Sequence, residues 1–187
     1  MLILASASPR RQELLRNAAI PFEVQPADID ETLLPGESPR DCAERLAQEK
    51  AITVSRERPK DYVLGADTIV VVDEAILGKP RNAADAARML RLLSGRTHEV
   101  ITGVCVVDPV ASGAEQASET TRVTMREISD DEIRDYIATG EPMDKAGAYA
   151  IQGIASRWIP RIEGDYSNVV GLPVALVYSM LKKRGAI

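Results

Sequence analysis

The sequence opens on MLILASASPRRQELL (residues 1–15), and these residues give the first indication of the fold class. Residues 2–4 form a short apolar run that predicts a buried strand, and Ser8 followed by Pro9 is typical of the cap and first residue of a helix. The pair Leu14-Leu15 then supplies an apolar helix face. A strand, a tight loop and a helix within the first eighteen residues predict an α/β protein.

The rest of the chain continues this alternation of strands and helices. Further helices are expected at 39–57, 82–93, 129–137 and 173–183. Further strands are expected at 22–24, 62–72, 75–77, 100–107, 119–128 and 157–162, with 140–153 as a loop. The sequence has no internal repeat, low-complexity tract or long linker, so residues 1–187 are expected to form a single domain.

Composition places the chain among ordinary globular proteins. It has 187 residues, of which 45% are hydrophobic and 27% charged, which argues against disorder, a coiled coil or collagen. The formal net charge of -5 argues against non-specific binding to nucleic acid polymers or to anionic membranes. A polyanionic ligand would therefore need a local, concentrated cationic site.

Targeting features and cysteines indicate the cytoplasm. The N-terminal stretch has the wrong order and length for a secretory signal, and no apolar run approaches a membrane span. Cys42 and Cys105 lie in no C-x-x-C or Cys/His cluster. Both are therefore expected to be reduced, buried thiols.

The first helix breaks an electrostatic rule at its start. Arg10 and Arg11 occupy its opening turn, where the helix dipole prefers acidic side chains. A phosphate would reverse this conflict, because free backbone N–H groups, the Ser6 and Ser8 hydroxyls and two guanidinium groups would converge on an anion. The alternative is two solvated surface arginines.

Lys50 is a second anomaly, because it lies on the apolar stripe of the helix at 39–57. It follows Leu46 by four residues and Ala47 by three, so it faces inward with them. Its ammonium could extend to the edge of the core, or it could reach a polar cleft and a phosphate. Both interpretations remain open at this point.

Asp67 is a third anomaly, since it places a carboxylate inside an apolar strand. Such a group is costly to bury unless a metal, a cation or hydrogen-bond donors receive it. Gly65 supports the alternative that Asp67 lies in a turn before the strand. The acidic loop with Asp28, Asp30 and Glu31 would suit magnesium or manganese, although such loops are more often simply solvated.

Two further residues carry weaker evidence. Lys79 lies in a Gly-Lys-Pro tripeptide, where Pro80 would stiffen the chain and fix a cation. His98, the single histidine, is more typical of a structural residue than of a catalytic one. Walker, dinucleotide, serine-hydrolase and zincin motifs are absent from the sequence.

Several blocks are spread along nearly the whole chain, in the order ASASPRRQELL, DIDET, GADTIVV, LGKP, LSGRTHEVITGV, DKAGAYAIQG and GDYSNVVGLP. Taken together, these blocks resemble the Maf family of nucleotide pyrophosphatases. The family's fold implies an elongated, mixed-sheet α/β structure related to inosine triphosphate pyrophosphatases, with two lobes flanking a cleft.

The resemblance implies a role for each matching residue. Asp67 would be the general base that activates water, and Glu31 and Asp67 would hold a divalent metal, which could be magnesium, manganese or cobalt. The resemblance also allows a homodimer. The residues that match family positions for the triphosphate are Ser6, Arg11, Lys50 and Lys79, and the catalytic set is Asp67, Glu31, Lys50 and Lys79.

Arg10, Thr68 and Gln152 match the dTTP/UTP branch of the family. The resemblance therefore implies metal-dependent hydrolysis of these triphosphates to monophosphate and pyrophosphate, in a house-cleaning role for the nucleotide pool. In the branch that acts on methylated GTP, the family pattern instead has Trp, Gln and Glu at these three positions. A regulatory binding protein that acts in septum formation during cell division is the alternative from another class.

Overall fold

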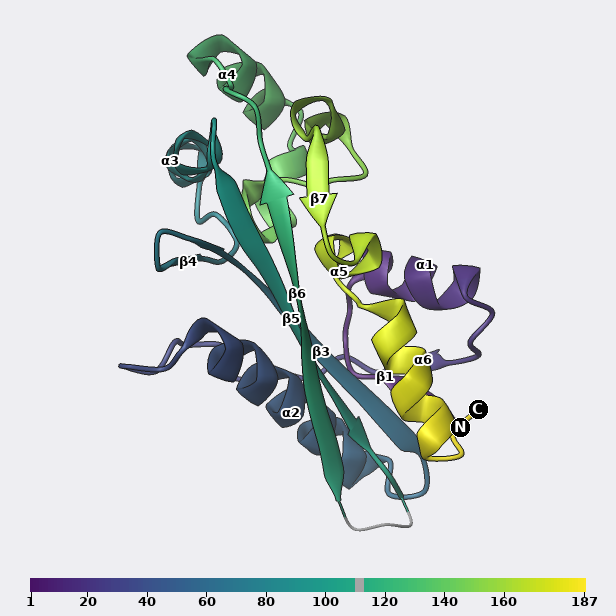
Figure 1. Cartoon of the computed structure of the whole chain (residues 1–187). Coiled ribbons are helices and arrows are strands. Elements are labelled where there is room, and N and C mark those ends of the chain that lie inside the picture. The colour runs from purple at the N-terminus through teal and green to yellow at the C-terminus, as the bar shows by residue number, and fades with distance from the viewer. Residues whose placement is uncertain (110–112) are drawn as a thin grey trace. The chain divides into compact units, whose positions relative to one another are not determined.

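The computed structural model of the protein describes residues 1–109 and 113–187 (Figure 1). Three short 3-10 turns lie between residues 138 and 161: η1 (Glu141–Asp144), η2 (Ala146–Ala148) and η3 (Ile154–Trp158). The strands are β1 (Leu2–Leu4), β2 (Glu23–Val24), β3 (Tyr62–Val72), β4 (Ala75–Leu77), β5 (Thr97–Val107), β6 (Ala114–Thr124) and β7 (Arg161–Glu163). The helices are α1 (Pro9–Asn17), α2 (Pro39–Glu57), α3 (Ala83–Leu93), α4 (Asp130–Ala138), α5 (Tyr166–Val170) and α6 (Val174–Lys183).

The strands form one mixed sheet with the order β2-β1-β3-β5-β6-β7, and β4 pairs with β3 outside this path. β1 runs parallel to both β2 and β3, whereas β4 and β7 run antiparallel to their partners β3 and β6. The predicted α/β class with a mixed sheet is therefore confirmed. Among the described residues, no helix is both long enough and apolar enough to span a membrane.

The chain divides into two compact units. Unit 1 comprises residues 1–68, 102–119 and 171–187, and unit 2 comprises residues 69–101 and 120–170. Strands β3, β5 and β6 contribute residues to both units. Unit 1 contains α1, α2 and α6, and unit 2 contains α3, α4 and α5.

In unit 1 the sheet is covered on both faces. Side chains of β1 alternate between two cores, as the pleat of a strand requires. Leu2 and Leu4 belong to a core that α1 and α6 complete, whereas Ile3 belongs to a core that α2 completes. Figure 1 shows α2 on one side of the sheet and α1 and α6 on the other. Cys42 and Cys105 are free and buried here, as predicted.

Two glycines allow α2 to pack closely on the sheet. A Cβ at Gly65 would lie 2.1 Å from the carbonyl oxygen of Ala47, and one at Gly103 would lie 2.3 Å from that of Ala43. No side chain fits in such a space, so the helix backbone contacts the strand backbone. Gly65 and Asp67 thus both lie inside β3, and the alternative that Asp67 lies in a turn before the strand is wrong.

Unit 2 confirms the local predictions for the β3–β4 hairpin and for the helices α3 and α4. Asp73 and Glu74 form the hairpin turn with positive φ angles of 47° and 66°. Asn82 caps α3 by accepting a hydrogen bond from the backbone N–H of Asp85 at 2.9 Å. Ser129 and Glu132 form a capping box at the start of α4, where a helix was expected.

Three predictions about the later part of the chain are wrong in detail. The strand expected at 119–128 is β6, which begins and ends earlier, because its mostly polar residues give a weak strand pattern. The strand expected at 157–162 is shorter, because Pro160 has no N–H for a ladder and separates η3 from β7. The loop expected at 140–153 contains η1 and η2, and α5 was missed.

A test of the close packing is the Gly65→Ala variant. The new methyl group would meet the backbone of α2, so we expect the free energy of unfolding to fall by about 1–3 kcal/mol or more, the typical cost of overpacking. Urea unfolding followed by circular dichroism measures it. Gly78→Ala is the control, because a Cβ there meets nothing within 4 Å. Equal urea midpoints for Gly65→Ala and Gly78→Ala would contradict the close contact between the backbones of α2 and β3.

Candidate functional site

Arg11 is buried in unit 1 beyond the end of β1. Ser8 caps α1 by accepting a hydrogen bond from the Arg11 backbone N–H at 3.4 Å, so Arg11 lies in the first turn. Its guanidinium donates three hydrogen bonds, to the carbonyl oxygen of Gly171 at 2.7 Å, to Ser6 Oγ at 3.1 Å and to Thr68 Oγ1 at 3.0 Å. The alternative of a solvated surface arginine is therefore wrong for Arg11.

The charge of Arg11 is only indirectly balanced. Burial lowers its pKa, and the charge of Arg10 lowers it further, whereas the charges of Asp67 and Glu31 raise it. The three acceptors are neutral oxygens, and they engage three of the five N–H groups of a guanidinium. A buried cation of this kind can take an anion without first breaking a salt bridge.

Thr102 and the carbonyl of Gly171 belong to the same network, and the sequence analysis missed both. Thr68 Oγ1 lies 2.9 Å from Thr102 Oγ1 and 3.3 Å from the Gly171 oxygen. Thr102 is fully buried in β5. A hydroxyl within a β-branched run is ordinary for a strand, which is why the sequence did not single it out.

A second cluster lies on the opposite face of β3, because Asp67 and Thr68 are neighbours in the strand and point to opposite sides. Lys50 Nζ from α2 lies 2.6 Å from Asp67 Oδ1 and 2.7 Å from Glu31 Oε1. Lys50 and Asp67 are each 8% exposed, whereas the Glu31 side chain is 53% exposed. The inward Lys50 thus meets two carboxylates.

These residues offer a small set of metal ligands. No group of three or more His, Cys, Asp or Glu side chains within residues 1–109 and 113–187 is arranged to hold a metal ion. Glu31 and Asp67 nevertheless direct one oxygen each at the same ammonium group. Two carboxylates fit magnesium, which commonly takes one or two from the protein and completes its shell with water and phosphate oxygens.

The remaining predicted residues are Arg10, Lys79 and Gln152. Arg10 is half-buried in unit 1, next to Arg11 in sequence. Lys79 and Gln152 are exposed and belong to unit 2. The loop of Lys79 is held locally, since Gly78 accepts a hydrogen bond from the backbone N–H of Gly147 at 3.1 Å.

His98 is part of the core of unit 2. Its Nε2 lies 2.7 Å from the hydroxyl of Tyr149, and the two rings meet edge to face. Burial lowers the His98 pKa to about 4. The second nitrogen, Nδ1, has no hydrogen-bond partner among the described residues, so an imidazolium N–H there would be unsatisfied. His98 is thus placed as a structural residue, in agreement with the sequence analysis.

Fold and site together define a class: an α/β protein in which buried cations and two carboxylates flank one strand of a mixed sheet. Comparison with known proteins gives the family. The family model described as Maf-like protein matches residues 1–184. The chain belongs to the Maf family.

Named relatives span nearly the same length. The dTTP/UTP pyrophosphatase of Koribacter versatilis (strain Ellin345) is 60% identical over 186 residues, which cover 100% of this chain and 95% of that protein. Those of Syntrophomonas wolfei subsp. wolfei and Geotalea uraniireducens are each 54% identical, over 97% and 100% of this chain and 96% of each relative. These names confirm the resemblance to the dTTP/UTP branch.

The buried imidazole of His98 predicts a stability that depends on pH. Its folded pKa of about 4 lies below the unfolded value of 6.5, so the contribution is fully present above pH 6.5 and is lost as the pH falls toward 4. This contribution to the free energy of unfolding is on the order of 3 kcal/mol. Urea unfolding at several pH values measures it, and His98→Gln should flatten this part of the profile. Parallel profiles for both proteins would contradict the prediction.

Proposed function

We propose that the protein hydrolyses dTTP and UTP to dTMP and UMP with release of pyrophosphate, using a divalent metal. The enzyme class is established by relatives named dTTP/UTP pyrophosphatase: the chain is a hydrolase that acts on phosphoanhydride bonds. The structural observation that best supports the proposal is the convergence of Glu31 and Asp67 on Lys50. A house-cleaning role in the cytoplasm and a homodimer are further parts of the proposal.

The general base in this proposal is Asp67. Its hydrogen bond to Lys50 uses Oδ1 and fixes the orientation of the carboxylate, so we assign proton acceptance to the other oxygen. The water molecule gives this proton to Asp67 while the water oxygen attacks the α-phosphorus. The bond from the α-phosphorus to the bridging oxygen breaks, and pyrophosphate leaves with the electron pair.

Cationic side chains bind the triphosphate in this proposal. A nucleoside triphosphate carries roughly four negative charges, so fixed cations are expected to supply much of the transition-state stabilisation. Arg11 supports this role best, since it is buried and bonded only to neutral oxygens within the described residues. We assign the phosphates to Ser6, Arg11, Lys50 and Lys79.

Glu31 and Asp67 are the residues that would hold the metal. A divalent ion such as magnesium, manganese or cobalt would supply charge neutralisation at the phosphate oxygens. Lys50 already shows that a cation is stable between these two carboxylates. In the presence of a triphosphate, the Lys50 ammonium is free to exchange a carboxylate oxygen for a phosphate oxygen.

We assign base selection to Arg10, Thr68 and Gln152. A glutamine amide both donates and accepts hydrogen bonds, which suits the Watson–Crick edge of a pyrimidine. Thr68 contributes indirectly, because its hydroxyl accepts a hydrogen bond from Arg11. The identity of the nucleotide is thus a testable part of the proposal.

A nucleotide panel tests the substrate. We expect kcat/KM for dTTP and UTP to exceed that for methylated GTP by at least about tenfold, since differences in hydrogen bonding to a substrate edge can reach far larger ratios. Pyrophosphate release is measured with magnesium, manganese and cobalt in turn, and a chelator serves as the control. Faster cleavage of methylated GTP would refute the assignment of the three base-selecting residues.

Asp67→Asn tests the general base. The variant keeps the shape of the side chain but cannot accept the proton, so we expect kcat to fall by at least about 100-fold, the lower end of what a positioned base contributes. The circular dichroism spectrum should be unchanged. Asp73→Asn, at the exposed turn after β3, is the matched control and should keep wild-type turnover. Near-normal release of pyrophosphate by folded Asp67→Asn would remove Asp67 from the mechanism.

A further inference from the structure

The loop that carries Glu31 has no helix or strand of its own. It runs from residue 25 to residue 38, between β2 and α2, and the Glu31 side chain is 53% exposed. A carboxylate on such a loop reaches Lys50 reproducibly only if the backbone around it is held. What holds this loop therefore decides where the Glu31 carboxylate lies.

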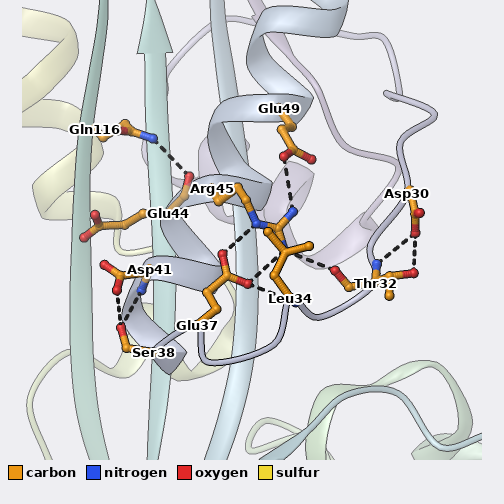
Figure 2. Close-up of polar contacts among 10 residues, drawn as sticks. All are labelled: Asp30, Thr32, Leu34, Glu37, Ser38, Asp41, Glu44, Arg45, Glu49 and Gln116. Carbon is orange, nitrogen blue, oxygen red and sulfur yellow. Dashed lines mark hydrogen bonds and ion pairs between the residues drawn. The ribbon is translucent and has the colours of Figure 1, made fainter.

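Arg45 of α2 holds the loop at two points (Figure 2). Its Nη2 donates to the carbonyl oxygen of Thr32 at 3.1 Å, one residue after Glu31. Its Nε and Nη2 bond both carboxylate oxygens of Glu37, at 2.6 Å and 3.0 Å, near the end of the loop. Nη1 donates to Glu49 at 3.2 Å, one turn further along the helix.

The loop also folds on itself on both sides of these points. Asp30 Oδ1 accepts hydrogen bonds from the backbone N–H of Thr32 at 2.9 Å and from its hydroxyl at 2.5 Å, which closes a tight turn around Glu31. Leu34 and Glu37 form a second turn, in which the Glu37 backbone N–H donates to the Leu34 carbonyl at 3.2 Å. Figure 2 shows the Thr32 carbonyl of the first turn and the Glu37 carboxylate of the second directed at Arg45.

Arg45 and Lys50 lie on the same helix, and each meets one end of this arrangement. Arg45 fixes the backbone next to Glu31, and Lys50 forms an ion pair with the Glu31 carboxylate. We propose that Arg45 is a positioning residue that places Glu31 beside Asp67 for the metal-dependent reaction. This inference rests on the proposed function for its catalytic consequence, although the hold of Arg45 on the loop does not.

An arginine is required here because of its shape. The planar guanidinium bonds a carboxylate through two N–H groups and has further N–H groups for Thr32 and Glu49, whereas a lysine offers one ammonium without this fork geometry. The Arg45 side chain is 20% exposed and that of Glu37 is 11% exposed, so solvent screens this pair less than a surface pair. Charge alone would not reproduce the contacts.

Arg45→Ala tests the proposal, with Arg58→Ala as the matched control. Arg58 is the C-cap residue of the same helix and pairs with Glu23 of β2 and with Asp61, not with Thr32 or Glu37. In Arg45→Ala we expect the manganese concentration for half-maximal activity to rise about tenfold or more, as when a residue that orients a ligand is lost. KM for the nucleotide at saturating manganese should change less. Arg45→Lys should resemble Arg45→Ala.

Hydrogen exchange gives a readout that needs neither metal nor substrate. In metal-free Arg45→Ala we expect the amides of residues 28–37 to exchange faster than in the wild type, while those of β3 keep their protection. Arg58→Ala should leave the loop unchanged. Calorimetric titration with manganese alone then shows whether the loosened loop also weakens metal binding.

The outcomes separate this inference from the proposed function. A wild-type protein that cleaves no nucleotide of the panel would refute the proposed function, and exchange and manganese titration would still decide the role of Arg45. An active wild type with equal exchange and equal manganese titration in the Arg45→Ala and Arg58→Ala variants would overturn the inference. Full rescue by Arg45→Lys would also overturn it, because it would reduce the role to charge.

Discussion

The contact of Lys50 with Asp67 and Glu31 requires the helix α2 to pack close to the strand β3 in unit 1. A buried carboxylate on β3 is costly unless a metal, a cation or hydrogen-bond donors receive it, and here α2 supplies a cation, Lys50. The helix must lie close to the strand for a lysine to reach Asp67 without leaving the core. Gly65 provides this distance, because it lets the backbone of α2 contact the backbone of β3 two residues before Asp67.

Successive side chains of β3 point to opposite faces of the sheet, so this one strand places different polar groups on the two faces. Asp67 faces α2 and its ammonium, whereas Thr68 faces α1 and the guanidinium of Arg11. The Arg11 network reaches residue 171, 160 positions later in the chain, and so ties the segment before α6 to α1. One strand thus connects carboxylates on one face to a buried cation on the other, and their charges affect the pKa of Arg11.

Much of this could be predicted from the sequence, because the decisive patterns are local. Ser8-Pro9 fixed the start of α1, and the apolar stripe of α2 showed that Lys50 faces inward. An aspartate in an apolar strand is costly whatever its partner, so the sequence alone singles out Asp67. The partners themselves were not predictable, since nothing in the sequence near Arg11 indicates the carbonyl of Gly171. The 3-10 turns after α4 were missed for a related reason: such short turns follow no hydrophobic period.

The two cationic clusters differ in what ligand binding would cost. Arg11 already donates to neutral oxygens, so an anion can use its remaining N–H groups while those bonds persist. Lys50 lies between two anions, so a metal that binds Glu31 and Asp67 must take over that balance of charge, and the ammonium then needs a new anion. A triphosphate brings this anion together with the metal. Under the proposed function, the arrangement would therefore favour joint binding of metal and nucleotide over binding of the metal alone, and the acidic loop and its anchor on α2 would belong to the same site.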